Sequence, residues 1–582
     1  MAFHPKLSER CNLEAGNRGI LVRLGFDEPL LRTLTIPALI FLLSYLILFL
    51  GMSLRPNFFD EGIVLTAAMR VVAGQVPHRD FYTLYGPAQF YLLSALFRVF
   101  GESILVERLL DLAVRALVVT SMFRIASFHC RKSVATCTSI VAVLWLFGLN
   151  EGNPGAAVIP LSLLNLMSTE LILPVFWRGV SRRRMLVAGA IAGIATMFRY
   201  DCGIALLAVH ACTVIIAASL GNPSVPKRLG AFASAFWPYL FGFVVVILPP
   251  AVYYFSVAPL YPFIHDFILY PLKYYHRGRN RPYPAIRMFS IDELADYLPI
   301  AIVGVSFLVV LTHRIRGGME AESRNEVDFS ERKREGFLIA FGLLALVMYF
   351  KGFVRISPVQ LYLCTIPSLL LVAVLFQRRL AFPFMLRIAV IGIVWFSILA
   401  AGFSCRYRVM MERNQHSSVL ESLVLSARQT TPKGKLAWCK VDNALTRGFC
   451  FVPDNDRLQT IEFIDGHTRP DQPLFVGLRK HDKIYANDCI TYFAAQRLPA
   501  TRWSQFDPDL QNREDIQRQM IQELEASAPP YVVLDSEFES SHEPNDSSIS
   551  SGVTLLDEYL RGRYRQVESF GPMSIWQLKP AP

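Results

Sequence analysis

The stretch TIPALIFLLSYLILFLGMSL, residues 35–54, runs for twenty positions without a charged side chain. A helix of roughly 17 to 25 apolar residues is long enough to cross the hydrocarbon core of a bilayer. The stretch lacks a small-residue cleavage site and is longer than the core of a signal peptide. It therefore predicts a retained transmembrane helix.

Composition extends this prediction to most of the chain. Of 582 residues, 53% are hydrophobic and 18% are charged, and the mean hydropathy is +0.35, which excludes an ordinary soluble globular protein. We expect a polytopic α-helical membrane protein with about 11 transmembrane helices, near residues 34–54, 103–124, 133–149, 155–177, 185–198, 203–220, 230–256, 298–312, 337–350, 360–376 and 381–403.

The net charge of +11 fits a nucleic acid, an anionic membrane surface or a phosphorylated ligand as partner. With eleven spans and an inner N-terminus, most basic residues fall in short cytoplasmic loops, as the positive-inside rule requires. Because they are spread over membrane loops, nucleic-acid binding is disfavoured. The same topology places residues 55–102, 257–297 and the chain after about 405 outside an inner or plasma membrane.

Two adjacent acids, Asp60 and Glu61, open the first outer loop. Apolar residues follow on one helical face as far as Gly74, and a second apolar segment lies between Pro87 and Gly101. We expect two short helices in the outer interface. Acids in a first helical turn contribute roughly 0.3 to 1 kcal/mol, which one acid would supply. Helix stabilisation and a functional role are both open for the pair.

The outer segment 257–297 is rich in tyrosine, proline and basic residues, against the charge rule that the other loops follow. Lys273, Arg277 and Arg279 are candidate phosphate ligands, with tyrosines beside them for a sugar or isoprenoid. The alternative is nonspecific contact with anionic headgroups.

After residue 405 the composition is that of a soluble protein. Runs such as PLFVGL (473–478), YVVLD (531–535), SIWQL (574–578) and KLAWCKV (435–441) predict strands that alternate with helices near 487–496 and 512–527. We expect a transmembrane domain over 1–404 and an extracytoplasmic α/β domain over 405–582. For Cys439 and Cys450 the sequence leaves two alternatives open, a disulfide and two free thiols.

The first outer loop, with its Asp-Glu pair and AAMRVVAGQVPHRDFYTLYGPAQFYLL after it, resembles the polyprenyl-phosphate-dependent glycosyltransferases of the GT-C superfamily. The relatives meant are the protein mannosyltransferases and the lipid A aminoarabinose transferase. The resemblance is strongest over 55–115 and weaker at GIATMFRYDCGIAL (193–206) and KGFVRISPVQLYLCTIPSLLL (351–371). It implies an inverting transfer of a monosaccharide from a polyprenyl-phosphate donor to an envelope glycan, lipid or protein. Membrane lipids are the other partners that it implies.

By this resemblance Asp60 is the candidate catalytic base, with Glu61 beside it. Asp80 and Tyr85 are candidates for the substrate site, and Arg199, Lys351 and Arg355 join the loop cations as candidate phosphate ligands at outer span ends. For Arg199 an ion pair with Asp201 is the alternative, and for Asp80 a surface ion pair.

Two departures from the family stand out. A lysine that relatives place before the loop proline is Gly86 here, and Ser357 and Gln360 stand where relatives often carry Asp and His. No metal site is assigned, although Asp60, Glu61 and Glu151 leave a divalent ion open. The rival readings are a transporter or flippase of lipid-linked sugars and a non-catalytic envelope scaffold.

Overall fold

The computed structural model describes residues 28–54, 56–149, 157–221, 224–283, 291–320, 329–352, 355, 360–377, 384–413 and 455–580. The Ser357, Glu151, Cys439 and Cys450 of the sequence analysis, and the expected strand 435–441, lie outside these ranges.

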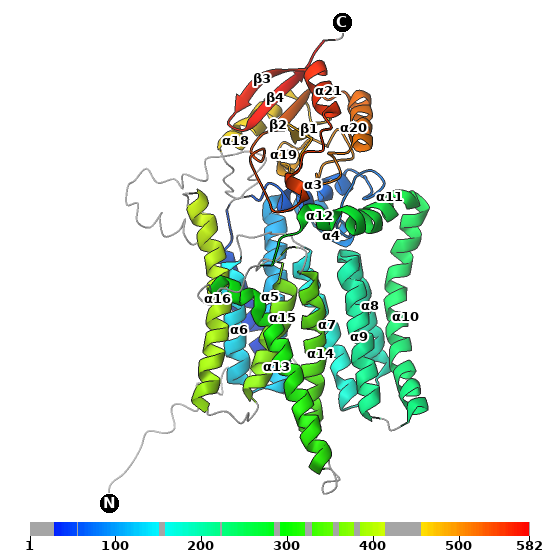
Figure 1. The fold of residues 1–582 in the computed structure, drawn as a ribbon, viewed down its shortest axis with the longest axis vertical. Helices are drawn as coiled ribbons and strands as arrows, with labels where there is room; N and C mark the ends of the chain where they lie inside the picture. The colour runs from blue at the N-terminus through cyan, green and yellow to red at the C-terminus, as the bar shows by residue number, and fades with distance from the viewer. Residues whose placement is uncertain are drawn as a thin grey trace, which may run out of the picture.

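A helix lies in each of the eleven apolar windows, and the helices stand side by side as a bundle (Figure 1). Within the described residues, four segments are long and apolar enough to cross a membrane: Val158–Phe176, Tyr200–Leu220, Val225–Val257 and Ala295–Ile315. Shorter apolar stretches lie in several of the others. The bundle helices are α2 (Glu28–Leu50), α5 (Ile104–His129), α6 (Lys132–Gly148), α7 (Val158–Ile172), α8 (Arg182–Phe198), α9 (Tyr200–Gly221), α10 (Val225–Val257), α13 (Ile291–Glu320), α14 (Phe329–Lys351), α15 (Tyr362–Gln377) and α16 (Phe384–Arg413).

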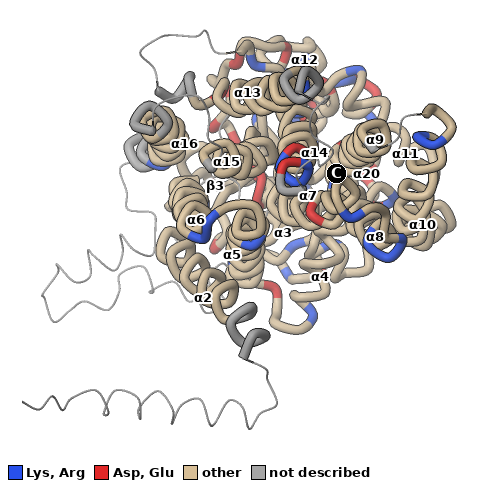
Figure 2. Tube along the Cα trace, turned by 90° about the horizontal axis from the view of Figure 1, so that it is seen from below, with Lys and Arg blue, Asp and Glu red and all other residues tan. Residues whose placement is uncertain are grey.

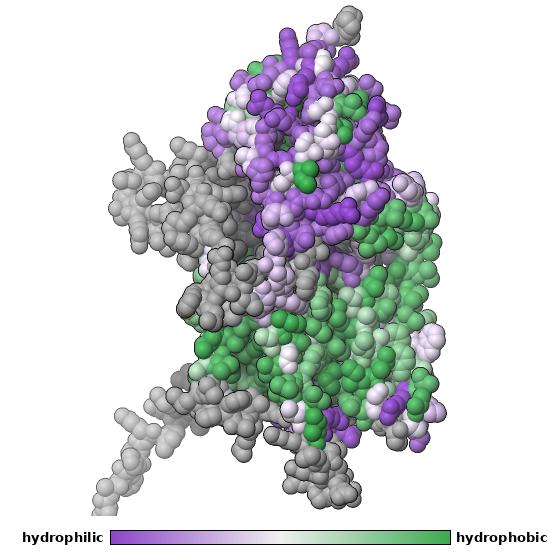
Figure 3. All heavy atoms as spheres, viewed as in Figure 1, coloured by the Kyte–Doolittle hydropathy of each residue, from purple (hydrophilic) through white to green (hydrophobic). Residues whose placement is uncertain are grey.

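Side-chain chemistry divides the molecule along its long axis. The bundle surface is a broad hydrophobic band, and the part above it is hydrophilic (Figure 3). Seen from the end remote from the C-terminus, Lys and Arg lie at the near ends of α6 and α8 (Figure 2). This is the distribution that the positive-inside rule predicts for a cytoplasmic end.

The first outer loop forms the two expected short helices, α3 (Asp60–Val72) and α4 (Ala88–Phe100). Gly74 and Gly101 follow their ends with φ of 87° and 85°, backbone that glycine adopts without strain. The second outer segment is also helical from Leu260 to Arg279, with α11 (Leu260–Ile264), two π-helical turns η2 (His265–Leu269) and η3 (Pro271–Tyr275), and α12 (His276–Arg279).

The C-terminal part carries a small mixed sheet in the order β1 (Phe475–Leu478), β2 (Tyr531–Asp535), β4 (Met573–Leu578), β3 (Tyr564–Phe570). β1 pairs parallel with β2, and the other two pairings are antiparallel. Three expected strands are confirmed, whereas β3 was not predicted because five of its seven residues are exposed. The helices are α18 (Asn455–His467), α19 (Ile490–Ala494), α20 (Glu514–Ser527) and α21 (Leu555–Arg563), with the 3₁₀ turn η5 (Asp546–Ser548) in the polar loop.

Helix α3 differs from a helix that buries a single face. Every residue from Glu61 to Val71 is buried, because α4 packs along one side of α3 and α19 covers another. A Cβ on Gly62 would lie 2.5 Å from the Ile490 nitrogen, so only glycine permits this approach. Thr66 Oγ1 donates to the Cys489 carbonyl at 2.8 Å. The C-terminal part over residues 455–580, called below the outer domain after its predicted side of the membrane, therefore holds in place the helix that begins with Asp60.

Candidate active site

Asp60 is the first residue of α3, at the junction between bundle and outer domain. The Asn57 side chain accepts hydrogen bonds from the backbone N–H groups of Phe59 and Asp60, both at 3.0 Å, and so fixes the helix start. Among the described residues, none forms a hydrogen bond or ion pair with the Asp60 carboxylate. Burial raises the pKa of this carboxyl group, the positive charges of Arg279 and Arg355 oppose the rise, and the negative charge of Asp507 adds to it.

Glu61 has a different environment. Its carboxylate is fully buried and accepts two hydrogen bonds from Arg108, at 2.5 and 2.8 Å, and one from the backbone N–H of Asn57, at 2.7 Å. Arg108 belongs to α5, so this ion pair fastens α3 to the bundle. Glu61 lies next to Asp60 in sequence, but its oxygens are occupied.

The loop LYGP brings Tyr85 to the outer end of α8. The Gly86 N–H donates to the Phe198 carbonyl at 3.1 Å, and a Cβ at Gly86 would lie 2.2 Å from the Met197 carbonyl oxygen. A side chain cannot fit there, so this close approach requires glycine at position 86. Burial raises the pKa of Tyr85, and the charge of Asp60 raises it further while that of Arg199 lowers it. Tyr85 thus lies in the electrostatic field of both residues.

Arg199 forms the ion pair with Asp201 that the sequence left open, with two hydrogen bonds of 3.0 Å. The Lys351 Nζ lies 3.6 Å from the same carboxylate. The ends of α8 and α14 therefore lie close together at Asp201, whose carboxylate interacts with both candidate phosphate ligands. Because one carboxylate offsets only one of the two basic side chains, one net positive charge remains here.

Of the three basic residues proposed from segment 257–297, the structure places Arg279 beside Asp60. Its guanidinium lies over the ring of Phe59, 5.6 Å from the centroid, and donates to Asp507 at 3.1 Å. Lys273 and Arg277 are exposed, and Lys273 lies over the ring of Tyr274 instead. Burial raises the pKa of Tyr275 of the same segment, and the charges of Arg279, Arg199, Asp507 and Arg355 also act on this pKa. Tyr275 therefore belongs to the same group of residues.

Asp80 lies at a turn rather than among these charges. Its carboxylate accepts hydrogen bonds from the Val76 N–H at 2.7 Å and from Arg79 at 2.9 Å, and its carbonyl accepts one from Arg70. Burial raises the pKa of Asp80, but the Arg79 and Val76 hydrogen bonds outweigh that effect and leave it lowered. Asp80 therefore stabilises the shape of the first outer loop.

The outer domain contributes two acids that sequence reasoning missed. Asp507 is buried and accepts hydrogen bonds from Arg279, from the Tyr82 hydroxyl at 3.2 Å and from Gln505 at 2.7 Å. Glu543 binds Arg281 and Arg355. Both acids stand in polar loops far along the chain from their partners, and the spacing of residues in the sequence carries no signal of such a pairing.

These residues form one group, called here the outer cluster: Asp60, Tyr85, Arg199, Asp201, Tyr275, Arg279, Arg281, Lys351, Arg355, Asp507 and Glu543. Its five basic side chains and four carboxylates leave one positive charge. In the part of the chain that the structure describes, no three His, Cys, Asp or Glu residues are arranged to hold a metal ion.

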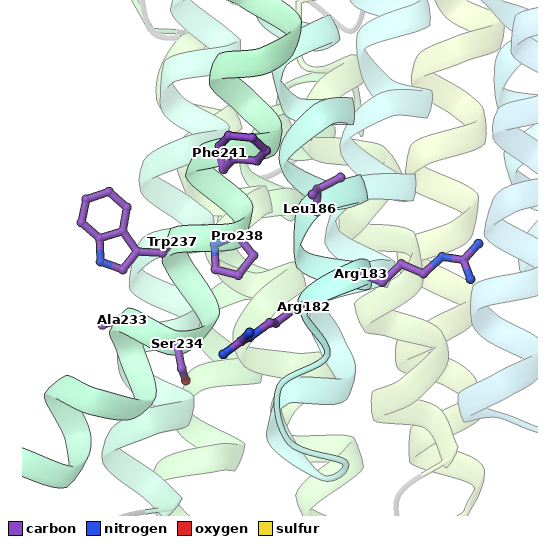
Figure 4. Close-up of a pocket in the computed structure, with 8 residues that line it drawn as sticks. All are labelled: Arg182, Arg183, Leu186, Ala233, Ser234, Trp237, Pro238 and Phe241. Atoms are coloured by element: carbon purple, nitrogen blue, oxygen red, sulfur yellow. The ribbon is translucent and has the colours of Figure 1, made fainter.

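A separate groove lies between α8 and α10, at the opposite end of α8. It is lined by Arg182, Arg183, Leu186, Ala233, Ser234, Trp237, Pro238 and Phe241. Arg182 points toward Ser234, and Trp237 extends away from α8 (Figure 4), while Trp237 and Phe241 are both exposed. The 17 residues of α8 separate this groove from Arg199 by ~25 Å, at 1.5 Å per residue. The groove is therefore not part of the outer cluster.

Several apolar helices, four of the described segments long enough to cross a bilayer, indicate a multi-pass membrane protein, and its fold is similar to that of a solved structure. The crystal structure of ArnT from Cupriavidus metallidurans bound to undecaprenyl phosphate matches with a TM-score of 0.52 at 12% sequence identity, over 94% of this chain and 98% of that chain. The expected resemblance is thereby confirmed at the level of fold.

Two further solved structures match more loosely. An oligosaccharyltransferase of Archaeoglobus fulgidus in complex with zinc and sulfate gives a TM-score of 0.46 at 10% identity, over 90% of this chain and 71% of that chain. ArnT from Cupriavidus metallidurans in the apo state gives 0.41 at 12% identity, over 93% and 97%. No protein-family model and no curated protein matches the sequence.

Proposed function

We propose that this chain is an inverting glycosyltransferase that moves a monosaccharide from a polyprenyl-phosphate carrier to a cell-envelope glycan, lipid or protein. The reaction takes place at the outer cluster, on the extracytoplasmic face of the inner or plasma membrane, with the domain over 405–582 outside. The observation that carries the proposal is Asp60: a carboxylate with no described hydrogen-bond partner, among cations, at the start of the helix that the outer domain covers.

Asp60 is suited to the role of general base. An acceptor hydroxyl is a poor nucleophile at neutral pH, and a positioned base contributes about 100- to 10,000-fold to the rate. The acceptor oxygen attacks the anomeric carbon while its proton passes to the Asp60 carboxylate. The bond from the anomeric carbon to the phosphate oxygen breaks, and in-line displacement inverts the centre.

The cations of the outer cluster are suited to the leaving group. Negative charge grows on the carrier phosphate as the glycosidic bond breaks, and fixed positive charges stabilise it without reorganisation. The single net positive charge of the cluster equals the single negative charge of a sugar phosphodiester. Arg199, Lys351, Arg279 and Arg355 are the proposed phosphate ligands, and Lys273 and Arg277 are exposed residues outside this set.

The remaining proposed site residues have supporting roles. Tyr85 is proposed to contact the donor sugar or phosphate between Asp60 and Arg199. Glu61 positions α3 through its pair with Arg108, and Asp80 shapes the loop that precedes Tyr85.

The test is turnover of radiolabelled polyprenyl-phosphate sugars by the full-length protein in proteoliposomes, read as release of free carrier phosphate. We expect one donor of a panel to be turned over by the wild type and not by Asp60→Asn. Binding of the carrier without turnover of any donor, together with passage of a lipid-linked sugar across the bilayer, would instead support a transporter.

A further inference from the structure

Glu543 belongs to the outer domain, yet its carboxylate lies against two arginines of the membrane domain. Arg355 donates from Nη1 to Oε2 at 2.9 Å and from Nη2 to Oε1 at 2.7 Å. Arg281 donates from Nε to Oε1 at 3.0 Å and pairs with the same oxygen through Nη2. The Glu543 side chain is 4% exposed.

This arrangement is the one that two arginines offer to a phosphate. A guanidinium binds two oxygens of a carboxylate or of a phosphate by the same pair of parallel hydrogen bonds. The charge of Arg355 also acts on Asp60, so Arg355 lies within electrostatic range of the proposed base. A phosphate that comes close enough to Asp60 to react would compete with Glu543 for the same N–H donors.

The three charged side chains differ in how well water can solvate them once the ion pairs separate. Arg281 and Arg355 are 42% and 25% exposed, so both stay hydrated when a counter-ion leaves. Glu543 is buried, and its carboxylate regains water only if its own segment moves. Separation therefore requires movement of the outer-domain segment and leaves the arginines in place.

That segment can move as a unit because it is held by its own hydrogen bonds. The Glu543 N–H donates to Ser548 Oγ, whose hydroxyl can donate to the Glu543 carbonyl, both at 2.7 Å. Asn545 Oδ1 accepts from the Ser547 N–H at 3.1 Å. Beyond the Glu543 ion pairs, Asn545 adds one hydrogen bond to the Asn280 carbonyl, at 2.7 Å. These polar contacts, together with the packing of η5 against α12, fasten the turn 543–548 to the membrane domain.

Building on the proposed function, we infer that Glu543 is a displaceable counter-anion. It occupies the Arg281 and Arg355 pair until a polyprenyl phosphate binds, and the bound phosphate then displaces the turn 543–548. Donor occupancy and the position of this outer-domain loop are thereby coupled. The free energy needed to part Glu543 from the arginines is subtracted from the affinity for the donor.

The experiment measures binding of undecaprenyl phosphate to the purified full-length protein in nanodiscs, so that it does not depend on turnover. Glu543→Gln keeps the size of the side chain and removes its charge. We expect its dissociation constant to be about tenfold lower than that of the wild type, because a neutral competitor is easier to displace. Glu539→Gln is the matched control in the same loop, since Glu539 lies 3.8 Å from the exposed Lys480, and it should bind like the wild type.

Hydrogen exchange of residues 543–548 supplies a second measurement. We expect undecaprenyl phosphate to increase exchange there in the wild type and to change little in Glu543→Gln. If the ion pair is static, Glu543→Gln should bind undecaprenyl phosphate as weakly as the wild type or more weakly, and binding should slow the exchange of residues 543–548. That result would overturn the inference and leave the proposed function in place. If neither protein binds undecaprenyl phosphate, the inference and the proposed function both fail.

Discussion

Replacing Asp60 by asparagine should abolish turnover and leave the protein folded. The Asp60 side chain has no described hydrogen bond that the amide would break, and burial raises its pKa, so the charged form is disfavoured in the folded state. A raised carboxyl pKa stabilises the folded state at low pH, and this stabilisation is lost as pH rises. At neutral pH the negative charge of Asp60 therefore lowers the free energy of unfolding. We expect the Tm of Asp60→Asn to equal or exceed that of the wild type.

The expected loss of rate follows from the role of the base. Removal of a general base costs about 100- to 10,000-fold, or about 3 to 5 kcal/mol of barrier at 1.36 kcal/mol per decade. The loss should appear in kcat, with little change in carrier binding. The assay is release of carrier phosphate at saturating donor, with Tm measured on the same preparations.

Two other acids of the loop serve as controls because the structure gives them different surroundings. Asp80→Asn changes a partly exposed pair with Arg79, worth about 0 to 1 kcal/mol, and should turn over at near wild-type rate. Glu61→Gln breaks the buried ion pair with Arg108, which costs about 3 to 5 kcal/mol, so its Tm should fall. More than a tenth of wild-type turnover in Asp60→Asn, or an equal loss in Asp80→Asn, would refute the assignment.

Three further predictions concern other parts of the molecule. Gly86→Ala places a Cβ 2.2 Å from the Met197 carbonyl and should lower both Tm and kcat/KM, whereas Gly230→Ala, with open space around it, should change neither. Asp507→Asn removes a charge that raises the pKa of Asp60, so the acid limb of the pH–rate profile should move to lower pH; a move to higher pH would contradict this electrostatic picture. Burial raises the pKa of Asp535 from 3.8 to about 7, so outer-domain stability should decline as pH rises through this range; a Tm series from pH 5 to 8 should show a shallower decline in Asp535→Asn.

The sequence alone determined the bundle. Runs of apolar residues long enough to cross a bilayer have few alternatives to helix, since the backbone must satisfy its own hydrogen bonds in lipid. The start of α3 at Asp60 was also predictable, because acids in a first turn and a glycine after the last turn are local signals. Strands β1, β2 and β4 followed from buried runs of β-branched and aromatic residues, and β3 did not, because its residues are mostly exposed.

Tertiary structure alone decided which charges meet. Asp60 and Glu61 are neighbours in sequence, but the charges of Arg279 and Arg355 act on Asp60, whereas Glu61 is buried against Arg108. Arg277 and Arg279 are two residues apart, and one is exposed while the other binds Asp507. Ion pairs such as Arg355 with Glu543 join segments nearly two hundred residues apart. Local patterns fix helices because helical hydrogen bonds are local, whereas the partner of a charge depends on how distant segments pack.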